Sequence, residues 1–203
     1  MAEQKRFLRE ELEPCLEAAA AGQGHVLFVD AAHFVLGAFV WCLWSLGRVF
    51  VRAGSGRQRL NVLGAWNAMT RELITVTNTS VVNKETMCEL LRKVAGQGWR
   101  GPITVVLDNA RYQRNAMVQE LAKELGIRLL YLPSYSPNLN LIERLWKFIR
   151  RQVLYGRYYA RFDEFRGAIE GCLSQINTVH KAALNRLMTL EFQTFDNVSL
   201  LDV

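Results

Sequence analysis

Three acidic residues, far apart along the chain, each stand at the boundary of a segment with the pattern of a buried element. Asp30 ends an apolar run, Asp108 follows another, and Glu143 opens an amphipathic helix. Carboxylates of this kind suit hard cations such as magnesium. Two such ions, about 3.5 to 4 Å apart, can activate a water or a DNA 3′ hydroxyl and stabilise the leaving oxygen of a phosphodiester. We interpret the three residues as one split metal site, in which Asp30 bridges the ions and Asp108 and Glu143 each bind one.

Each carboxylate also has a purely structural interpretation. Asp30 can cap a turn, and Asp108 can cap the following helix or close an Asx-turn. Glu143 can complete a capping box with Asn140 or pair with Lys147 one helical turn later. Taken singly, each residue is more readily explained as structural. Taken together, three carboxylates at one predicted edge favour a functional site.

The elements that must position these residues are indicated by hydrophobic periodicity. Helical spacing predicts helices at 3–21, from 83, at 115–125, from about 141 and at 162–176, and Pro14 must kink or divide the first of them. Apolar runs predict strands at 25–31, over 34–51 as one or two strands, and at 60–68, 72–77, 103–107 and 127–132. Residues 177–203 predict a short helix and a loose tail.

The order of these elements predicts an antiparallel meander followed by parallel β-α-β units. It places Asp30 at the end of the first strand and Asp108 at the end of the fourth. Sites in sheets with parallel strands collect beyond the carboxyl ends of the strands. Adjacent central strands would therefore set the two aspartates side by side, with Glu143 leaning over the same edge.

The formal charge of +6 favours a polyanionic partner. Between residues 144 and 162 the chain has no Asp or Glu, and cations alternate with aromatic rings. Such a stretch can neutralise phosphates and stack on bases. A solvated helix face with aromatic residues in the core explains it equally well. The cations predicted to bind DNA are Arg144, Lys147, Arg150, Arg151 and Arg157.

Other features of the sequence argue against secretion and membrane insertion. The four cysteines are widely spaced and lack a zinc-ligand pattern, which favours reduced core thiols in a cytosolic protein. The first 13 residues carry charges throughout and do not resemble a signal peptide. The longest uncharged apolar run, 34–47, has 14 residues, fewer than the roughly 20 that span a bilayer.

Two motifs carry a resemblance to a known family. LPSYSPNLNLIERLW at 132–146 and VLDNA at 106–110 resemble the DDE transposases of bacterial insertion sequences, in the mariner-like superfamily and most closely the six-thirty insertion-sequence family. The resemblance runs from about residue 25 to 176. The 34 residues between Asp108 and Glu143 match the spacing that this family shows between its second aspartate and its glutamate.

The resemblance implies an RNase H-like fold, with a mixed five-stranded sheet of an antiparallel meander and parallel strands flanked by helices. It implies DNA strand cleavage and joining at element ends, with insertion at a TA dinucleotide. It assigns the metal-ligand roles to Asp30, Asp108 and Glu143, which would hold two magnesium ions or manganese as a substitute. A homodimer on DNA is expected, since two element ends must be processed together, and the reaction would take place at the nucleoid in the bacterial cytoplasm.

The sequence also departs from the family pattern. Leu141 stands where proline is common, and Arg111-Tyr-Gln113 lies where many relatives have a histidine after Asp-Asn. Full-length relatives carry N-terminal helix-turn-helix modules, for which this sequence has no room. The expected division is a linker helix at 1–24, a catalytic domain at 25–176 and a C-terminal helix and tail at 177–203. Such a chain would bind DNA mainly through phosphates and with little sequence choice.

Three further features have weaker functional interpretations. Asn109 and Asn140 can orient the carboxylates by hydrogen bonds, although turn and capping roles fit them equally well. His33 is close to Asp30 in sequence, but a hydrogen-bonded core residue is the favoured interpretation. Gly54-Ser-Gly56-Arg57 could bind phosphate but lacks the lysine and helix of a P-loop.

Two rival functions use the same fold. An RNase H-like nuclease would hydrolyse DNA with the same metals and would never join strands. A catalytically inactive relic or regulator would bind DNA without cutting it, and its binding would survive the loss of Asp108. Strand transfer from a free 3′ hydroxyl distinguishes the transposase from both.

Overall fold

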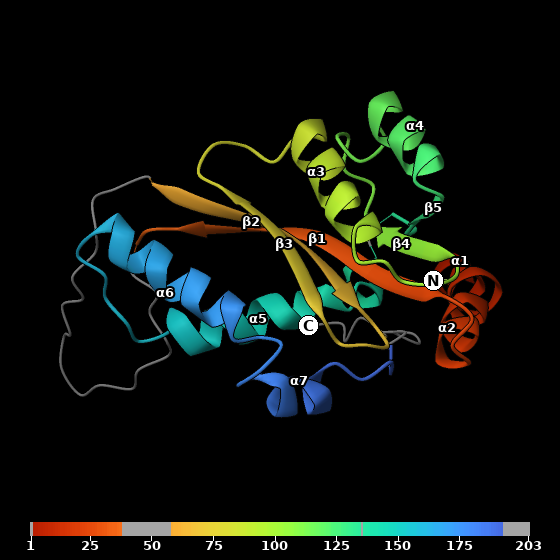
Figure 1. Ribbon diagram of the computed structural model, residues 1–203. Coiled ribbons are helices and arrows are strands. Elements are labelled where there is room, and N and C mark those ends of the chain that lie inside the picture. Colours follow the sequence, from red (N-terminus) through yellow and green to blue (C-terminus); the bar gives the residue numbers. More distant parts are fainter. Residues whose placement is uncertain (1, 38–57, 135, 193–203) are drawn as a thin grey trace, which may run out of the picture.

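The computed structural model describes residues 2–37, 58–134 and 136–192. The strands in this part of the chain form one five-stranded sheet in the order β3-β2-β1-β4-β5 (Figure 1). β1 pairs antiparallel with β2, and β2 antiparallel with β3, whereas β1, β4 and β5 are parallel. The predicted mixed sheet is therefore confirmed. The strands are β1 (His25–Val35), β2 (Arg59–Asn67), β3 (Leu73–Asn78), β4 (Ile103–Leu107) and β5 (Ile127–Tyr131).

Strand β1 is longer than predicted. It continues past Asp30 to Val35, because its second half pairs with β2 while its first half pairs with both β2 and β4. Asp30 thus lies in the middle of β1 and not at its end. Of the one or two strands predicted over 34–51, residues 34 and 35 belong to β1 and residues 36 and 37 form a bend. Residues 38–57, with Cys42 and the Gly54–Arg57 segment, lie outside the described residues.

Helices cover both faces of the sheet (Figure 1). On one face α3 (Lys84–Ala95) and α4 (Ala116–Glu124) pack against a cluster that includes Leu27, Val29 and Val105. On the other face the N-terminal helix, α5 (Ile142–Val153), α6 (Phe162–Ser174) and α7 (Lys181–Leu187) share a cluster with Val26 and Phe28. Successive side chains of β1 point to opposite faces, so this strand contributes to both cores.

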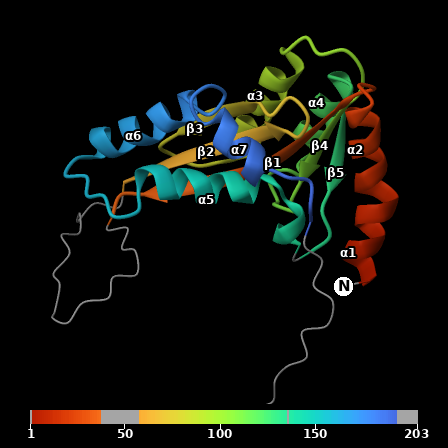
Figure 2. The same cartoon turned by 90° about the horizontal axis from the view of Figure 1, so that it is seen from below.

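The N-terminal helix follows the prediction of a division near Pro14. It consists of α1 (Ala2–Phe7), a π-helical turn at Leu8–Leu12 and α2 (Glu13–Ala20). The proline ring provides no N–H for the helix. The Cys15 thiol donates a hydrogen bond to the Glu11 carbonyl, at 3.1 Å, beside this interruption. Figure 2 shows this helix running along the β4 and β5 side of the sheet.

The segment after α6 is fastened to the sheet by polar contacts. Leu73 N–H donates to the Asn177 side-chain oxygen at 3.0 Å, and the Arg71 guanidinium donates to the Asn185 carbonyl at 2.7 Å. The predicted short helix is α7, and residues 193–203 lie outside the described part. Among the described helices, none has the length and apolar character needed to cross a bilayer. The described cysteines, Cys15, Cys88 and Cys172, carry free thiols.

Candidate active site

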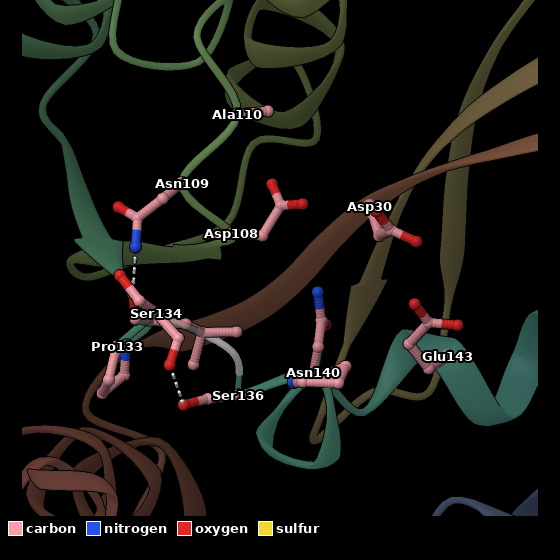
Figure 3. Close-up of a pocket in the computed structure, with 11 residues that line it drawn as sticks. Asp30, Asp108, Asn109, Ala110, Pro133, Ser134, Ser136, Asn140 and Glu143 are labelled. Carbon is pink, nitrogen blue, oxygen red and sulfur yellow. Dashed lines mark hydrogen bonds between the residues drawn. The ribbon is translucent and has the colours of Figure 1, made fainter.

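Two of the three predicted carboxylates are brought together by strand pairing. The parallel register sets Val29 opposite Leu107, so the next residues on the two neighbouring strands are Asp30 and Asp108. β4 ends there, while β1 continues. Both aspartates are half-buried, and Figure 3 shows them facing the same opening.

Glu143 reaches the same opening from the first turn of α5 (Figure 3). The three carboxylates line a cavity of about 270 Å³, together with Asn109, Ala110, Leu132, Pro133, Ser134, Ser136, Pro137 and Asn140. The structural interpretations of Glu143 are absent from the described residues: no side chain caps α5, and Glu143 forms no ion pair with Lys147. Its carboxylate therefore faces the cavity without a capping or ion-pair partner among the described residues.

The start of α5 is held in place by the loop that precedes it. A single 3-10 turn, Pro137–Leu139, leads to Asn140, whose Nδ2 donates to the Val29 carbonyl of β1 at 3.2 Å. This bond links the loop to the residue just before Asp30. Leu141 has a φ of −58°, close to the value that a proline ring would impose, so the departure from the family pattern keeps the same backbone geometry.

Asp30 has the most strongly altered environment of the three carboxylates. Burial, followed by the negative charge of Glu143, raises its pKa to about 7. Asp108 raises the pKa further, whereas hydrogen bonds from the Ala31 backbone and the Trp146 indole lower it. The indole Nε1 donates to Asp30 Oδ2 at 2.9 Å. Without a cation, therefore, Asp30 is half protonated near neutral pH.

The oxygens of this cavity fit a hard divalent cation. Asp108 Oδ1 and Asn140 Oδ1 are both buried and accept no hydrogen bond from the described residues. A buried oxygen without a donor costs on the order of 1 to 3 kcal/mol, which a bound cation offsets. Among the described residues, no three Asp, Glu, His or Cys side chains are already drawn together closely enough to hold an ion.

Asn109 does not contact the carboxylates that it was predicted to orient. Its Nδ2 donates to the Leu132 carbonyl at 2.6 Å, and its Oδ1 accepts a hydrogen bond from Arg114 Nε at 2.9 Å. The Arg114 guanidinium also lies 4.6 Å from the centre of the Tyr131 ring. Asn109 thus joins the loop after β4 to the end of β5, which holds Asp108 in place indirectly.

Two aromatic residues near the site were missed by the sequence analysis. Trp146 is one of the aromatic residues in the 144–162 stretch, for which the sequence predicts a nucleic-acid face or a core position, and it donates a hydrogen bond to Asp30. The pKa of the Tyr112 hydroxyl is raised by burial and then by the charges of Asp108 and Asp30, so this hydroxyl interacts electrostatically with the site. His33, by contrast, lies 2.7 Å from Asn61 Oδ1; it is hydrogen-bonded as predicted but exposed, and not a core residue.

The predicted DNA-binding cations differ in their surroundings. Lys147, Arg151 and Arg157 are exposed, and Arg150 is half-buried over the Phe34 ring at 5.5 Å. Arg144 instead donates hydrogen bonds to the carbonyls of Leu187, Thr189 and Glu191, which fastens the C-terminal segment to α5. Its guanidinium is therefore largely engaged within the protein.

Residues 25–166 match the sequence model of a family described as DDE superfamily endonuclease. No curated protein sequence matches significantly. A chain of a pre-cleavage Mos1 transpososome is similar in structure, with a TM-score of 0.64, 12% identity, and coverage of 96% of this chain and 63% of that one. The catalytic domain of Mos1 mariner transposase gives a TM-score of 0.59 at 11% identity, covering 92% of this chain and 89% of the domain.

One chain of a viral complex has a similar fold. A chain of the simian T-cell lymphotropic virus intasome, solved in complex with the PP2A regulatory subunit B56 gamma, gives a TM-score of 0.53 at 15% identity, covering 76% of this chain and 49% of that one. The chain thus spans about half to two thirds of the length of the larger proteins it resembles. At these identities the likeness concerns the fold, and it confirms the predicted RNase H-like architecture.

Proposed function

Because this chain belongs to the DDE superfamily endonucleases and has the fold of a mariner transposase catalytic domain, we propose that it cleaves DNA at the ends of an insertion sequence and joins the freed 3′ ends to target DNA. The observation that carries the proposal is the convergence of Asp30, Asp108 and Glu143, from three separate elements, on one cavity. Bound magnesium or manganese, two ions in the proposal, would activate the attacking hydroxyl and stabilise the leaving oxygen.

The residues of the protein would bind the cations and position the loops around them. Asp30, whose carboxylate interacts electrostatically with both of the others, is the proposed bridging ligand, and Asp108 and Glu143 would each complete one metal site. The partial burial of these groups would limit the water that competes for the cations. Asn140 and Asn109 hold the two loops that carry the ligands, through their bonds to the Val29 and Leu132 carbonyls.

The exposed cations of α5 and the loop after it are the proposed contacts to DNA phosphates. Lys147, Arg151 and Arg157 have the charge and exposure for this role, and Arg150 contributes at the border with the core. A TA target, action as a homodimer and action at a bacterial nucleoid belong to the same proposal. So does the division into a helix at 1–24, a catalytic unit at 25–176 and an accessory segment at 177–203.

The proposal is tested by a nicking and strand-transfer assay with magnesium or manganese, on DNA that carries the element ends and on ends already cut to a free 3′ hydroxyl. Asp108→Asn should lose both activities while keeping its fold by circular dichroism. Asp163→Asn, an exposed aspartate on α6, is the matched control and should remain active. Nicking without strand transfer would support the nuclease, and DNA binding without any cleavage would support the inactive relic.

A further inference from the structure

The contact between Trp146 and Asp30 is a feature that metal chemistry alone does not require. Trp146 lies on α5 three residues after Glu143 and is 1% exposed. Its Nε1 donates to Asp30 Oδ2 at 2.9 Å. One side chain thereby joins the helix that carries Glu143 to the strand that carries Asp30.

Gly64 on β2 makes room for this contact. It stands directly opposite Asp30 in the antiparallel register. A Cβ atom at Gly64 would lie 2.6 Å from Trp146 Cη2, closer than packed atoms allow, and 3.0 Å from Cζ2, a tight contact. Since the backbone angles of Gly64 do not call for glycine, the close approach of the indole is the reason that a side chain is excluded here.

The hydrogen bond restricts the carboxylate in a way that suits a metal ligand. An N–H fixed on Oδ2 limits rotation of the Asp30 carboxylate and engages one of its oxygens. Partners of this kind orient ligands and typically change metal affinity roughly 10- to 100-fold when removed. Because the same indole sits on α5, it also sets where Glu143 stands relative to β1.

We propose that Trp146, seated over Gly64, is a positioning residue that fixes the Asp30 carboxylate and aligns the Glu143 helix with it for divalent cation binding. The inference rests on the proposed function, since it concerns the same cation site. It gives Trp146 a role distinct from a core residue or a ring that stacks on DNA.

The chain contains a matched control for this role. Trp66 on β2 is also 1% exposed and belongs to the same buried cluster, but its Nε1 has no hydrogen-bond partner among the described residues. Trp146→Phe and Trp66→Phe each shorten a buried ring by a similar amount. Only Trp146→Phe takes an N–H away from Asp30.

The first test is manganese binding by the full chain, measured by calorimetry in the absence of DNA. Trp146→Phe should weaken manganese binding roughly 10- to 100-fold, whereas Trp66→Phe should change it less than about twofold, even if the two variants lose similar thermal stability. Gly64→Ala, which displaces the indole, should resemble Trp146→Phe. Equal manganese affinity in native and Trp146→Phe protein would overturn the proposal.

The second test needs no metal. In ¹H–¹⁵N spectra the Trp146 indole N–H should exchange slowly with solvent deuterium, and Asp30→Ala should accelerate this exchange, while Asp30→Asn, which keeps an acceptor oxygen, should not. Unchanged exchange in Asp30→Ala overturns the proposal whatever the calorimetry shows. If exchange depends on Asp30 but manganese binding does not depend on Asp108, the proposed function fails while the Trp146 contact stands.

Discussion

The two walls of the cavity are held in different ways. The aspartates stand on a wall of paired strands, where five consecutive residue pairs, from His25 with Ile103 to Val29 with Leu107, fix the relative position of β1 and β4. The glutamate stands on a helix whose alignment depends on side chains, chiefly the Asn140 amide and the Trp146 indole. Backbone pairing tolerates most side-chain changes, so substitutions outside the carboxylates should harm the helix wall more readily than the strand wall.

The largest expected effect is the loss of DNA cleavage when a carboxylate is removed from either wall of the cavity. Glu143→Gln should lower the cleavage rate by at least on the order of 10²- to 10³-fold, the loss typical of removing a group that stabilises charge in the transition state. The loss of rate should equal that of Asp108→Asn, although Asp108 follows a paired strand and Glu143 lies on a helix. Cleavage kinetics with manganese check this, with exposed Glu120→Gln on α4 as the control. A Glu143→Gln variant that cleaves at the native rate would show that Glu143 is not part of the active site.

A second prediction concerns the pH dependence of stability in the metal-free chain. The pKa of Asp30 is raised from 3.8 to about 7, so the folded chain binds this proton more tightly than the unfolded chain. The resulting stabilisation is full below about pH 4 and is lost as the pH rises through 7, with a size on the order of a few kcal/mol.

Urea unfolding between pH 4 and 8, with chelator present, measures this loss. Asp30→Asn should flatten the profile and should be more stable than the native chain at pH 8. Manganese should restore stability to the native chain at pH 8 but not to the variant. A native profile as flat as that of Asp30→Asn would contradict the prediction.

A third prediction separates alignment of the helix wall from stability. Asn140→Ala removes the bond to the Val29 carbonyl and should lower the unfolding free energy by about 1 kcal/mol and the cleavage rate by roughly tenfold, since a small displacement of a reacting group is costly. Asn115→Ala removes the N-cap of α4, where Asn115 accepts a hydrogen bond from Met117 N–H. It should cost a similar stability, about 1 kcal/mol, with an unchanged rate. Equal rates in the two variants would mean that the helix wall is not aligned by Asn140.

The smallest expected effect concerns the outer surface of the same helix. Lys147→Ala and Arg151→Ala should each reduce the slope of log affinity for DNA against log salt by about 0.9, the contribution of one phosphate contact. Fluorescence anisotropy with duplex DNA at several salt concentrations measures the slope. Lys123→Ala, exposed on α4 at the opposite face of the sheet, should leave it unchanged. An equal change in all three variants would indicate a general charge effect and not a binding face.

Much of the strand wall could be predicted because each strand is indicated by a short run of apolar residues within the strand itself. The apolar run 103–107 became β4 with the predicted bounds, and Asp108 follows it. The extension of β1 was not predictable, because it depends on pairing with β2, which follows the chain segment 36–58. The Trp146 contact was not predictable either, because Trp146 lies 116 positions after Asp30 in the sequence. Arg144 looked like a surface cation, and only the tertiary structure shows that it fastens the C-terminal segment.

The placement of the parallel pair has a consequence for the newly made chain. β1 can pair with β4 only after residues 103–107 have been made, and residue 103 lies 78 positions after its partner, residue 25. Helix α5, which follows β5, then completes the cavity. Closing such long loops is slow compared with forming local structure. During synthesis, the two aspartates emerge from the ribosome before the glutamate, because both precede it in the sequence. A prematurely terminated chain that lacks α5 would hold only two of the three carboxylates and, under the proposed function, should not cleave DNA.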